Sequence, residues 1–156
     1  QALAASSLNT VALRYFNVFG PKQDPSSPYS GVISLFAKWA SENTAANVVG
    51  DGLQTRDFVF VDDVVSANLL ATTYATANQG SAVMNIATGN AITILELWQK
   101  VCGIYDFEGA PLIYSPLREG DIRESVADIC RAQQLLGYSA TTSLLDGLRK
   151  CLAASY

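Results

Sequence analysis

The stretch Arg56–Leu70 (RDFVFVDDVVSANLL) joins two kinds of hydrophobic periodicity, and it decides the fold class of this chain. Arg56–Val61 is an aromatic and β-branched run of strand length, and the apolar residues after it recur at helical spacing. Asp62 stands between the two patterns, at a position where a carboxylate caps a helix. A strand that passes directly into a helix is typical of α/β proteins.

The same alternation continues on both sides of this stretch. Further strands are predicted at Thr10–Val18, Asn47–Val49, Ala82–Ile86 and Leu112–Ser115. Further helices are predicted over residues 31–43, after the capping box Thr93–Glu96, from Asp128 to Gly137 and after Ser143. The segment 22–30 is rich in proline and serine and is predicted to be a loop. The sequence therefore predicts one α/β unit without repeats or linkers.

Composition excludes several function classes. The 156 residues contain no histidine, which removes Ser-His-Asp and Cys-His nucleophile systems and His-dependent zinc sites. The formal net charge of −4 argues against nucleic acid as a partner. Cys102, Cys130 and Cys151 form no CxxC pair and predict reduced thiols without a metal. No apolar run reaches the roughly 18 residues that span a bilayer, and we expect no membrane partner and a cytoplasmic protein.

Two arginines beside carboxylates are the main candidates for ligand binding. Arg56 and Arg118 could each hold two oxygens of a diphosphate, and Asp121 could accept hydrogen bonds from sugar hydroxyls. Asn17 ends a predicted strand, where α/β proteins place ligands. Taken alone, however, either arginine fits a solvated ion pair better, and Asp57 is expected to hold a loop or an arginine. The residues by themselves favour an α/β domain for a phosphorylated ligand.

Three motifs in order narrow this interpretation: LRYFNVFGP (Leu13–Pro21), GDGLQTRDFVFVDDV (Gly50–Val64) and REGDIRESVAD (Arg118–Asp128). Together they resemble the C-terminal half of extended short-chain dehydrogenase/reductases of the NAD-dependent sugar-nucleotide epimerase group. Within that group the chain resembles bacterial UDP-glucose and UDP-N-acetylglucosamine 4-epimerases. The resemblance implies the C-terminal part of a Rossmann-like α/β fold with a small mixed α/β substrate-binding domain. It places late strands of the Rossmann sheet at about 10–20, 56–75 and 82–88.

The resemblance also implies a set of site residues for a UDP-sugar. Ten positions take substrate-binding roles: Asn17, Arg56 and Arg118 at the diphosphate, Asp121 at the ribose, Asn47, Val48 and Val49 at the uracil, and Gly31, Val32 and Phe36 over the nucleotide. Phe16 takes the position beside the nicotinamide end of NAD.

Two family features are not found in this sequence. The Tyr-xxx-Lys pair and the glycine-rich NAD loop lie before the RYFN strand in the family. Here the residues before Arg14 resemble only the tail of the helix that follows the catalytic lysine. We therefore expect residues 1–156 to be the substrate-binding portion of an NAD-dependent 4-epimerase whose N-terminal half is absent. That chain alone is expected to bind no NAD and to have no catalytic residues or activity.

Several alternatives stay open. The complete enzyme is expected to be a homodimer, and the absent half or a second copy would cover apolar edges of this chain. The chain could instead be a standalone UDP-sugar-binding or interaction module. It could also be the same half of a sugar-nucleotide dehydratase, decarboxylase or reductase, because these enzymes share much of the pattern.

Overall fold

The computed structural model describes residues 9–24, 26, 31–78, 80–108 and 111–153. The helix tail expected at the start of the chain, and part of the loop expected over 22–30, lie outside these ranges. The strands are β1 (Thr10–Tyr15), β2 (Asn17–Phe19), β3 (Asn47–Val49), β4 (Thr55–Arg56), β5 (Phe58–Phe60), β6 (Ser81–Ile86), β7 (Ile92–Thr93) and β8 (Ile113–Ser115). The helices are α1 (Val32–Ser41), α2 (Val61–Ala77), α3 (Ile94–Tyr105), α4 (Cys130–Leu136) and α5 (Leu144–Ala153). Helices and strands alternate, which confirms the predicted α/β class.

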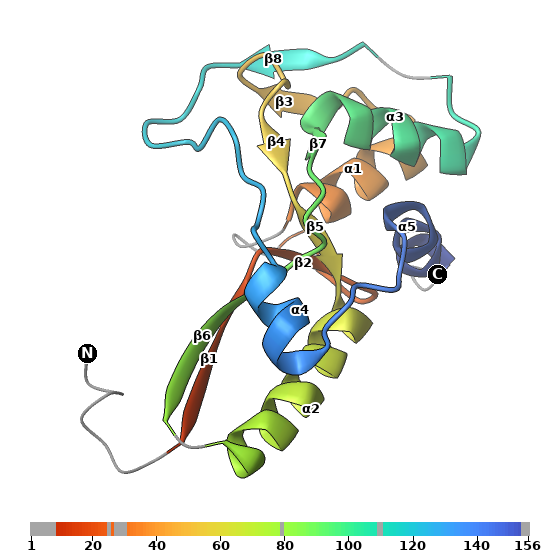
Figure 1. Ribbon diagram of the computed structural model, residues 1–156. Helices are drawn as coiled ribbons and strands as arrows, with labels where there is room; N and C mark the ends of the chain where they lie inside the picture. The colour runs from red at the N-terminus through yellow and green to blue at the C-terminus, as the bar shows by residue number, and fades with distance from the viewer. Residues whose placement is uncertain (1–8, 25, 27–30, 79, 109–110, 154–156) are drawn as a thin grey trace.

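The strands form four separate two-stranded sheets that lie in different parts of the molecule. β1 pairs with β6, β2 with β5 and β3 with β8, all in parallel, while β4 and β7 are antiparallel. Figure 1 shows β1 and β6 at one end beside α2 and α4, and β3 and β8 at the other end near α1 and α3. The pair β2–β5 lies between the two ends.

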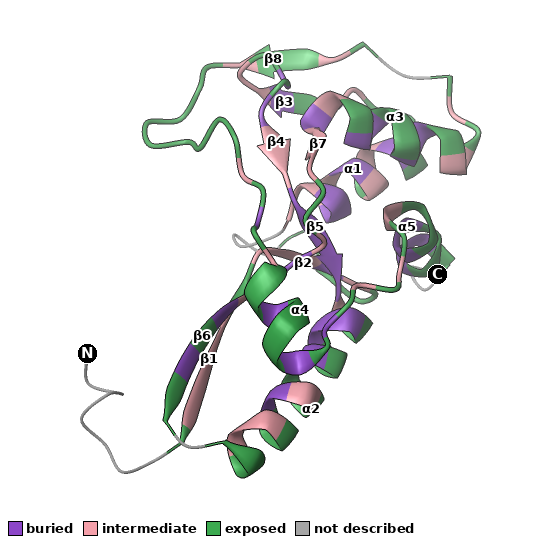
Figure 2. Ribbon diagram, in the orientation of Figure 1, coloured by how far each residue is buried: buried purple, intermediate pink, exposed green. Residues whose placement is uncertain are grey.

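Two hydrophobic cores meet at β5. Phe58 and Phe60 belong to a core that also contains Phe36 and residues of α3 and α5. Val59 belongs to the second core, which includes Met84 and residues of α2 and α4. Successive strand side chains point to opposite faces, so one three-residue strand contributes to both cores. Figure 2 shows β5 as a buried element between the two ends of the molecule.

The predicted strand Thr10–Val18 is two strands, which corrects the sequence-based boundary. The chain changes partners at Phe16, whose N–H donates to the carbonyl oxygen of Ile86 at 3.1 Å. The N–H of Asn17 then donates to the carbonyl oxygen of Asp57, also at 3.1 Å. One continuous β-propensity run can therefore serve two sheets, because propensity does not specify the pairing partner.

The predicted strand Arg56–Val61 is likewise interrupted, here at Asp57. The Asp57 side chain is fully buried, and its two oxygens accept hydrogen bonds from three backbone N–H groups and one hydroxyl. The donors are the N–H and hydroxyl of Thr88 (2.9 and 2.7 Å), the N–H of Gly89 (2.9 Å) and the N–H of Ala127 (3.3 Å). The prediction that Asp57 holds a loop is confirmed. The short strand β7 was not predicted, since two residues carry no periodic pattern.

The helix ends confirm some of the predicted caps and correct two. Ile129, and not the expected Asp128, is the N-cap residue of α4, while Oδ1 of Asp128 accepts a hydrogen bond from the N–H of Cys130 at 2.9 Å. α3 begins with the full capping box of Thr93 and Glu96, and Gly137 ends α4 in the left-handed conformation. The predicted Asp62 cap is wrong, because Phe60 is the N-cap residue of α2 and makes no side-chain cap. The neighbouring Asp63 is buried instead and accepts hydrogen bonds from residues 141 and 142.

None of the three cysteines is in a disulfide bond, and burial separates them into two kinds. Cys102 and Cys151 are buried and Cys130 is exposed. Burial raises the pKa of the Cys151 thiol to about 11. In the part of the chain that the structure describes, no group of three His, Cys, Asp or Glu side chains is placed to hold a metal, and no helix has the length and apolar character to cross a membrane.

Replacing the buried carboxylate of Asp57 should destabilise the fold strongly. Asp57→Asn keeps the side-chain shape but presents an NH2 group to backbone N–H donors. We expect the free energy of unfolding to fall by about 2–4 kcal/mol, since buried donors lose a charged acceptor. Urea denaturation followed by circular dichroism measures this. Asp62→Asn is the matched control, because Asp62 is largely exposed, and an equal effect of the two substitutions would contradict the role of Asp57.

The capping box of α3 should make stability depend on pH. The backbone N–H and hydroxyl of Thr93 hold the pKa of the Glu96 carboxyl below its ordinary value of 4.5. A lowered folded-state pKa adds stability that is present above the ordinary value and lost as the pH falls through the folded value. The difference in free energy of unfolding between wild type and Glu96→Gln should therefore narrow in acid. If this difference in free energy of unfolding stays constant from about pH 6 to pH 3, the ionised carboxylate of Glu96 is not the group that caps the helix.

Candidate functional site

A cavity of about 600 Å³ lies among α1, β3, β4 and the segment that follows β8. It gathers eight of the ten positions expected to bind substrate: Asn17, Val32, Asn47, Val48, Val49, Arg56, Arg118 and Asp121. These positions are distributed over more than a hundred residues of sequence. Their convergence on one cavity is a property of the tertiary structure.

Three of the positions expected at the site lie elsewhere. Phe36 is fully buried and packs against Trp98, with ring centroids 5.1 Å apart, so it lies in the core and does not line the cavity. Gly31 immediately precedes α1, and its carbonyl oxygen accepts hydrogen bonds from the N–H and hydroxyl of Ser34. Phe16, expected beside the cofactor, lies at the break between β1 and β2 and does not line the cavity.

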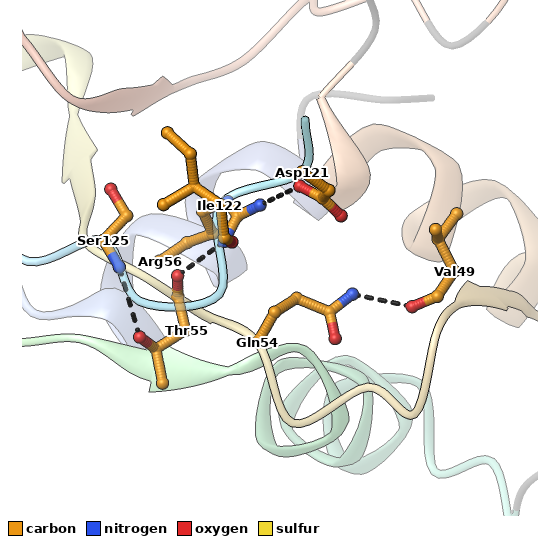
Figure 3. Close-up of polar contacts among 7 residues, drawn as sticks. All are labelled: Val49, Gln54, Thr55, Arg56, Asp121, Ile122 and Ser125. Carbon is orange, nitrogen blue, oxygen red and sulfur yellow. Dashed lines mark hydrogen bonds and ion pairs between the residues drawn. The ribbon is translucent and has the colours of Figure 1, made fainter. Parts of the chain in front are cut away.

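Arg56 forms the charged part of the cavity with the segment between β8 and α4. Its Nη2 donates to Oδ1 of Asp121 at 2.6 Å, and the two side chains are 17% and 22% exposed. Its Nη1 donates to the carbonyl oxygens of Ile122 and Thr55 at 2.6 and 2.8 Å (Figure 3). Arg56 thus holds this segment against β4, and its charge is partly balanced by Asp121.

Arg118 lines the same cavity but, unlike Arg56, is not paired with a carboxylate of the described residues. It is exposed and forms no ion pair with any residue that the structure describes. The two arginines expected at the diphosphate are therefore brought to one cavity but are not equivalent. Arg118 is the more available cation, while Arg56 also has a structural role.

The glycine turn after β3 is fastened to the same segment. Arg123 pairs with Asp51, which lowers the pKa of the Asp51 carboxyl and raises the pKa of the Arg123 guanidinium. Gly50 has a φ of +67°, and a Cβ there would lie 2.6 Å from Cδ2 of Leu117. The turn therefore needs glycine for its backbone conformation, whereas the exposed Leu117 side chain could move to make room for a Cβ.

Other cavity residues were missed by the sequence analysis. Leu35 and Trp39 lie on the same face of α1 as Val32, three and seven residues further along, and this helical spacing was the signal that could have found them. Gln54 is 5% exposed, and its Nε2 donates to the carbonyl oxygen of Val49 at 2.7 Å, which fixes the end of β3 (Figure 3). No sequence pattern indicated that contact.

Comparison with known proteins adds information about the whole chain. The family model for the NAD dependent epimerase/dehydratase family matches residues 1–87. A putative UDP-glucose 4-epimerase of Methanocaldococcus jannaschii is 38% identical over 88% of this chain and 43% of its own length. The chain thus spans about half the length of the curated relatives that it matches.

Solved structures agree with this match. The UDP-glucose 4-epimerase of Thermotoga maritima, solved with UDP-glucose, has a TM-score of 0.83 and 37% identity over 92% of this chain and 45% of its own. MoeE5 in complex with UDP-glucuronic acid and NAD has a TM-score of 0.87 and 34% identity over 99% of this chain and 50% of its own.

The ion pair inside the cavity should stabilise the protein more than the ion pair at the turn. Asp121→Asn removes the charged acceptor of the largely buried Arg56, and we expect a loss of about 1–2 kcal/mol in the free energy of unfolding. Asp51→Asn breaks a half-exposed pair in the same region and should have a much smaller effect that disappears in high salt. Chemical denaturation at low and high salt compares them. A salt-sensitive loss of equal size in both variants would contradict this assignment.

Proposed function

Because the chain belongs to the NAD-dependent epimerase/dehydratase family, we propose that it is the UDP-sugar-binding part of a sugar-nucleotide 4-epimerase. The observation that carries the proposal is the cavity, in which eight of the ten expected substrate positions meet. The names of the relatives and of the solved complexes support a nucleotide-diphosphate sugar as the ligand class.

Arg118 is the proposed primary contact of the diphosphate. A guanidinium binds two phosphate oxygens at once, and no carboxylate among the described residues competes for this one. Arg56 supplies a second positive charge at the same cavity, reduced by its pair with Asp121. Asn17 adds a carboxamide that can donate and accept hydrogen bonds.

Asp121 and the walls of the cavity are the proposed contacts of the nucleoside. Only Oδ1 of Asp121 is bound by Arg56, so Oδ2 can accept from ribose hydroxyls. Val32 on one wall and Asn47–Val49 on another enclose the rest of the nucleoside. Strong contacts to the diphosphate and nucleoside would anchor the ligand while leaving the sugar to be held by other groups.

The residues of this chain do not fit a complete NAD site. The sequence has neither a glycine-rich phosphate loop nor a Tyr-xxx-Lys pair, and Phe16 stands apart from the cavity. We therefore derive no hydride-transfer step from these residues. We propose that NAD and the catalytic base are supplied by another part of a longer enzyme, and that this chain alone is inactive.

The proposed place of the chain in that enzyme follows from its parallel strands. Segments 10–20, 56–75 and 82–88 contain β1, β2 and β5 and most of α2 and β6, and we assign them to the Rossmann sheet and its covering helix. The exposed side chains Tyr15 and Val83 on β1 and β6 would then be covered by the remainder of the enzyme or by a second copy. A homodimer is the proposed state of the whole enzyme.

Calorimetric titration with UDP and with UDP-N-acetylglucosamine tests the binding proposal. The folded wild-type chain should bind both saturably, and Arg118→Ala should weaken binding by about tenfold or more, since a charged hydrogen-bonding group is removed. Arg131→Ala is the matched control, because this exposed arginine lies on α4 and does not line the cavity. No binding by the folded chain, or equal loss in both variants, would contradict the proposal.

A further inference from the structure

Trp39 is a feature of the cavity that the expected substrate positions do not include. It lines the cavity from α1, together with Val32 and Leu35 on the same face of the helix. Of the lining residues, Trp39 is the one with an aromatic side chain. The α1 wall is otherwise aliphatic, whereas the opposite segment contributes Arg118, Glu119 and Asp121. The cavity thus has apolar side chains, one of them an indole, on one wall and charged groups on another.

The packing around Trp39 fixes its position. Its ring lies 6.0 Å from the ring of Phe36, measured between centroids, and Phe36 in turn packs edge-on against Trp98. Its carbonyl oxygen accepts hydrogen bonds from the N–H of Thr44 at 2.9 Å and from the Thr44 hydroxyl at 3.4 Å. The Phe36 contact supports the ring and the Thr44 hydrogen bonds hold the backbone that carries it, so Trp39 loses little freedom when a ligand binds, which favours affinity.

A nucleoside diphosphate is chemically complementary to this cavity, because it has a planar base at one end and anionic oxygens at the other. We propose that Trp39 is the stacking surface for the nucleobase of the bound nucleotide sugar. This inference rests on the proposed function and adds a residue to it. Val48 and Val49 of β3 line the same cavity but carry no π-face. The two lining arginines, whose planar guanidinium groups can also stack on bases, are assigned to the diphosphate, which leaves the indole as the aromatic ring for the base.

This assignment also explains the location of Phe36. The aromatic residue that the family pattern placed over the nucleotide lies behind the cavity wall, and Trp39, one helical turn later, lies in the wall. Phe36 therefore acts on the site through Trp39. Stacking on an aromatic ring tolerates any base, so Trp39 should orient the base plane without selecting between uracil and thymine.

Fluorescence gives a direct test, because Trp39 and Trp98 are the two tryptophans of the chain. Trp98 is 5% exposed and packs among Phe36 and Phe107 in the core. UDP should quench the emission of the wild-type protein, whereas inorganic pyrophosphate should not. In Trp39→Phe the quenching should vanish while calorimetry still detects UDP binding, since phenylalanine keeps an aromatic face.

Affinity provides the second readout. Trp39→Leu removes the π-face, and UDP binding should weaken by about tenfold while pyrophosphate binding is unchanged. Leu69→Ala, an exposed change on α2 outside the cavity, is the control for general effects. Arg118→Ala should weaken the binding of both UDP and pyrophosphate. This pattern separates loss of the phosphate contact from loss of the base contact.

The outcomes separate the two proposals. If wild-type protein does not bind UDP, both the proposed function and the stacking role are wrong. If UDP binds and Trp39→Leu binds it as tightly as wild type, only the stacking role is wrong. If Trp39→Leu does not fold by circular dichroism, the Trp39→Phe quenching result decides, and UDP quenching that persists there would overturn the inference.

Discussion

The buried carboxylate of Asp57 is the interaction on which the rest of the structure depends. Its two oxygens bind the turn after β6 at Thr88 and Gly89 and the segment before α4 at Ala127. These segments lie thirty to seventy residues from Asp57 in sequence. A fully buried charge is tolerated only where hydrogen bonds satisfy it. The carboxylate therefore requires these donors to be in place, and the donors in turn fix the positions of the two segments that carry them.

The cavity depends on the interruption between strands β4 and β5 at Asp57. Asp57 separates β4 from β5 and points into the interior, while its neighbour Arg56 points toward the cavity and the segment after β8. Arg56 holds Asp121 and Ile122 there, and so brings Arg118 to the same wall. One arginine is therefore needed to build the site in which a second arginine is available for an anion. The two arginines that were expected to bind a diphosphate therefore have different roles.

Much of the fold could be predicted because local patterns are strong in this chain. The capping box of α3, the glycine end of α4 and the strand Asn47–Val49 follow from local rules of capping and β-propensity, and the structure contains each of them. The corrections share one cause. Thr10–Val18 divides into two strands, and Phe36 is buried behind Trp39, because strand partners and the facing side of a helix depend on distant segments.

The sequence by itself determined the α/β class, the family, and the residue types available for a diphosphate. These follow from periodicity and from motifs whose spacing is local. Only the tertiary structure decided which of those residues meet in one cavity, that Arg56 is already paired with Asp121, and that Trp39 supplies an aromatic wall. The physical reason is that burial and ion pairing arise between segments far apart along the chain, and a linear pattern does not record which segments become neighbours.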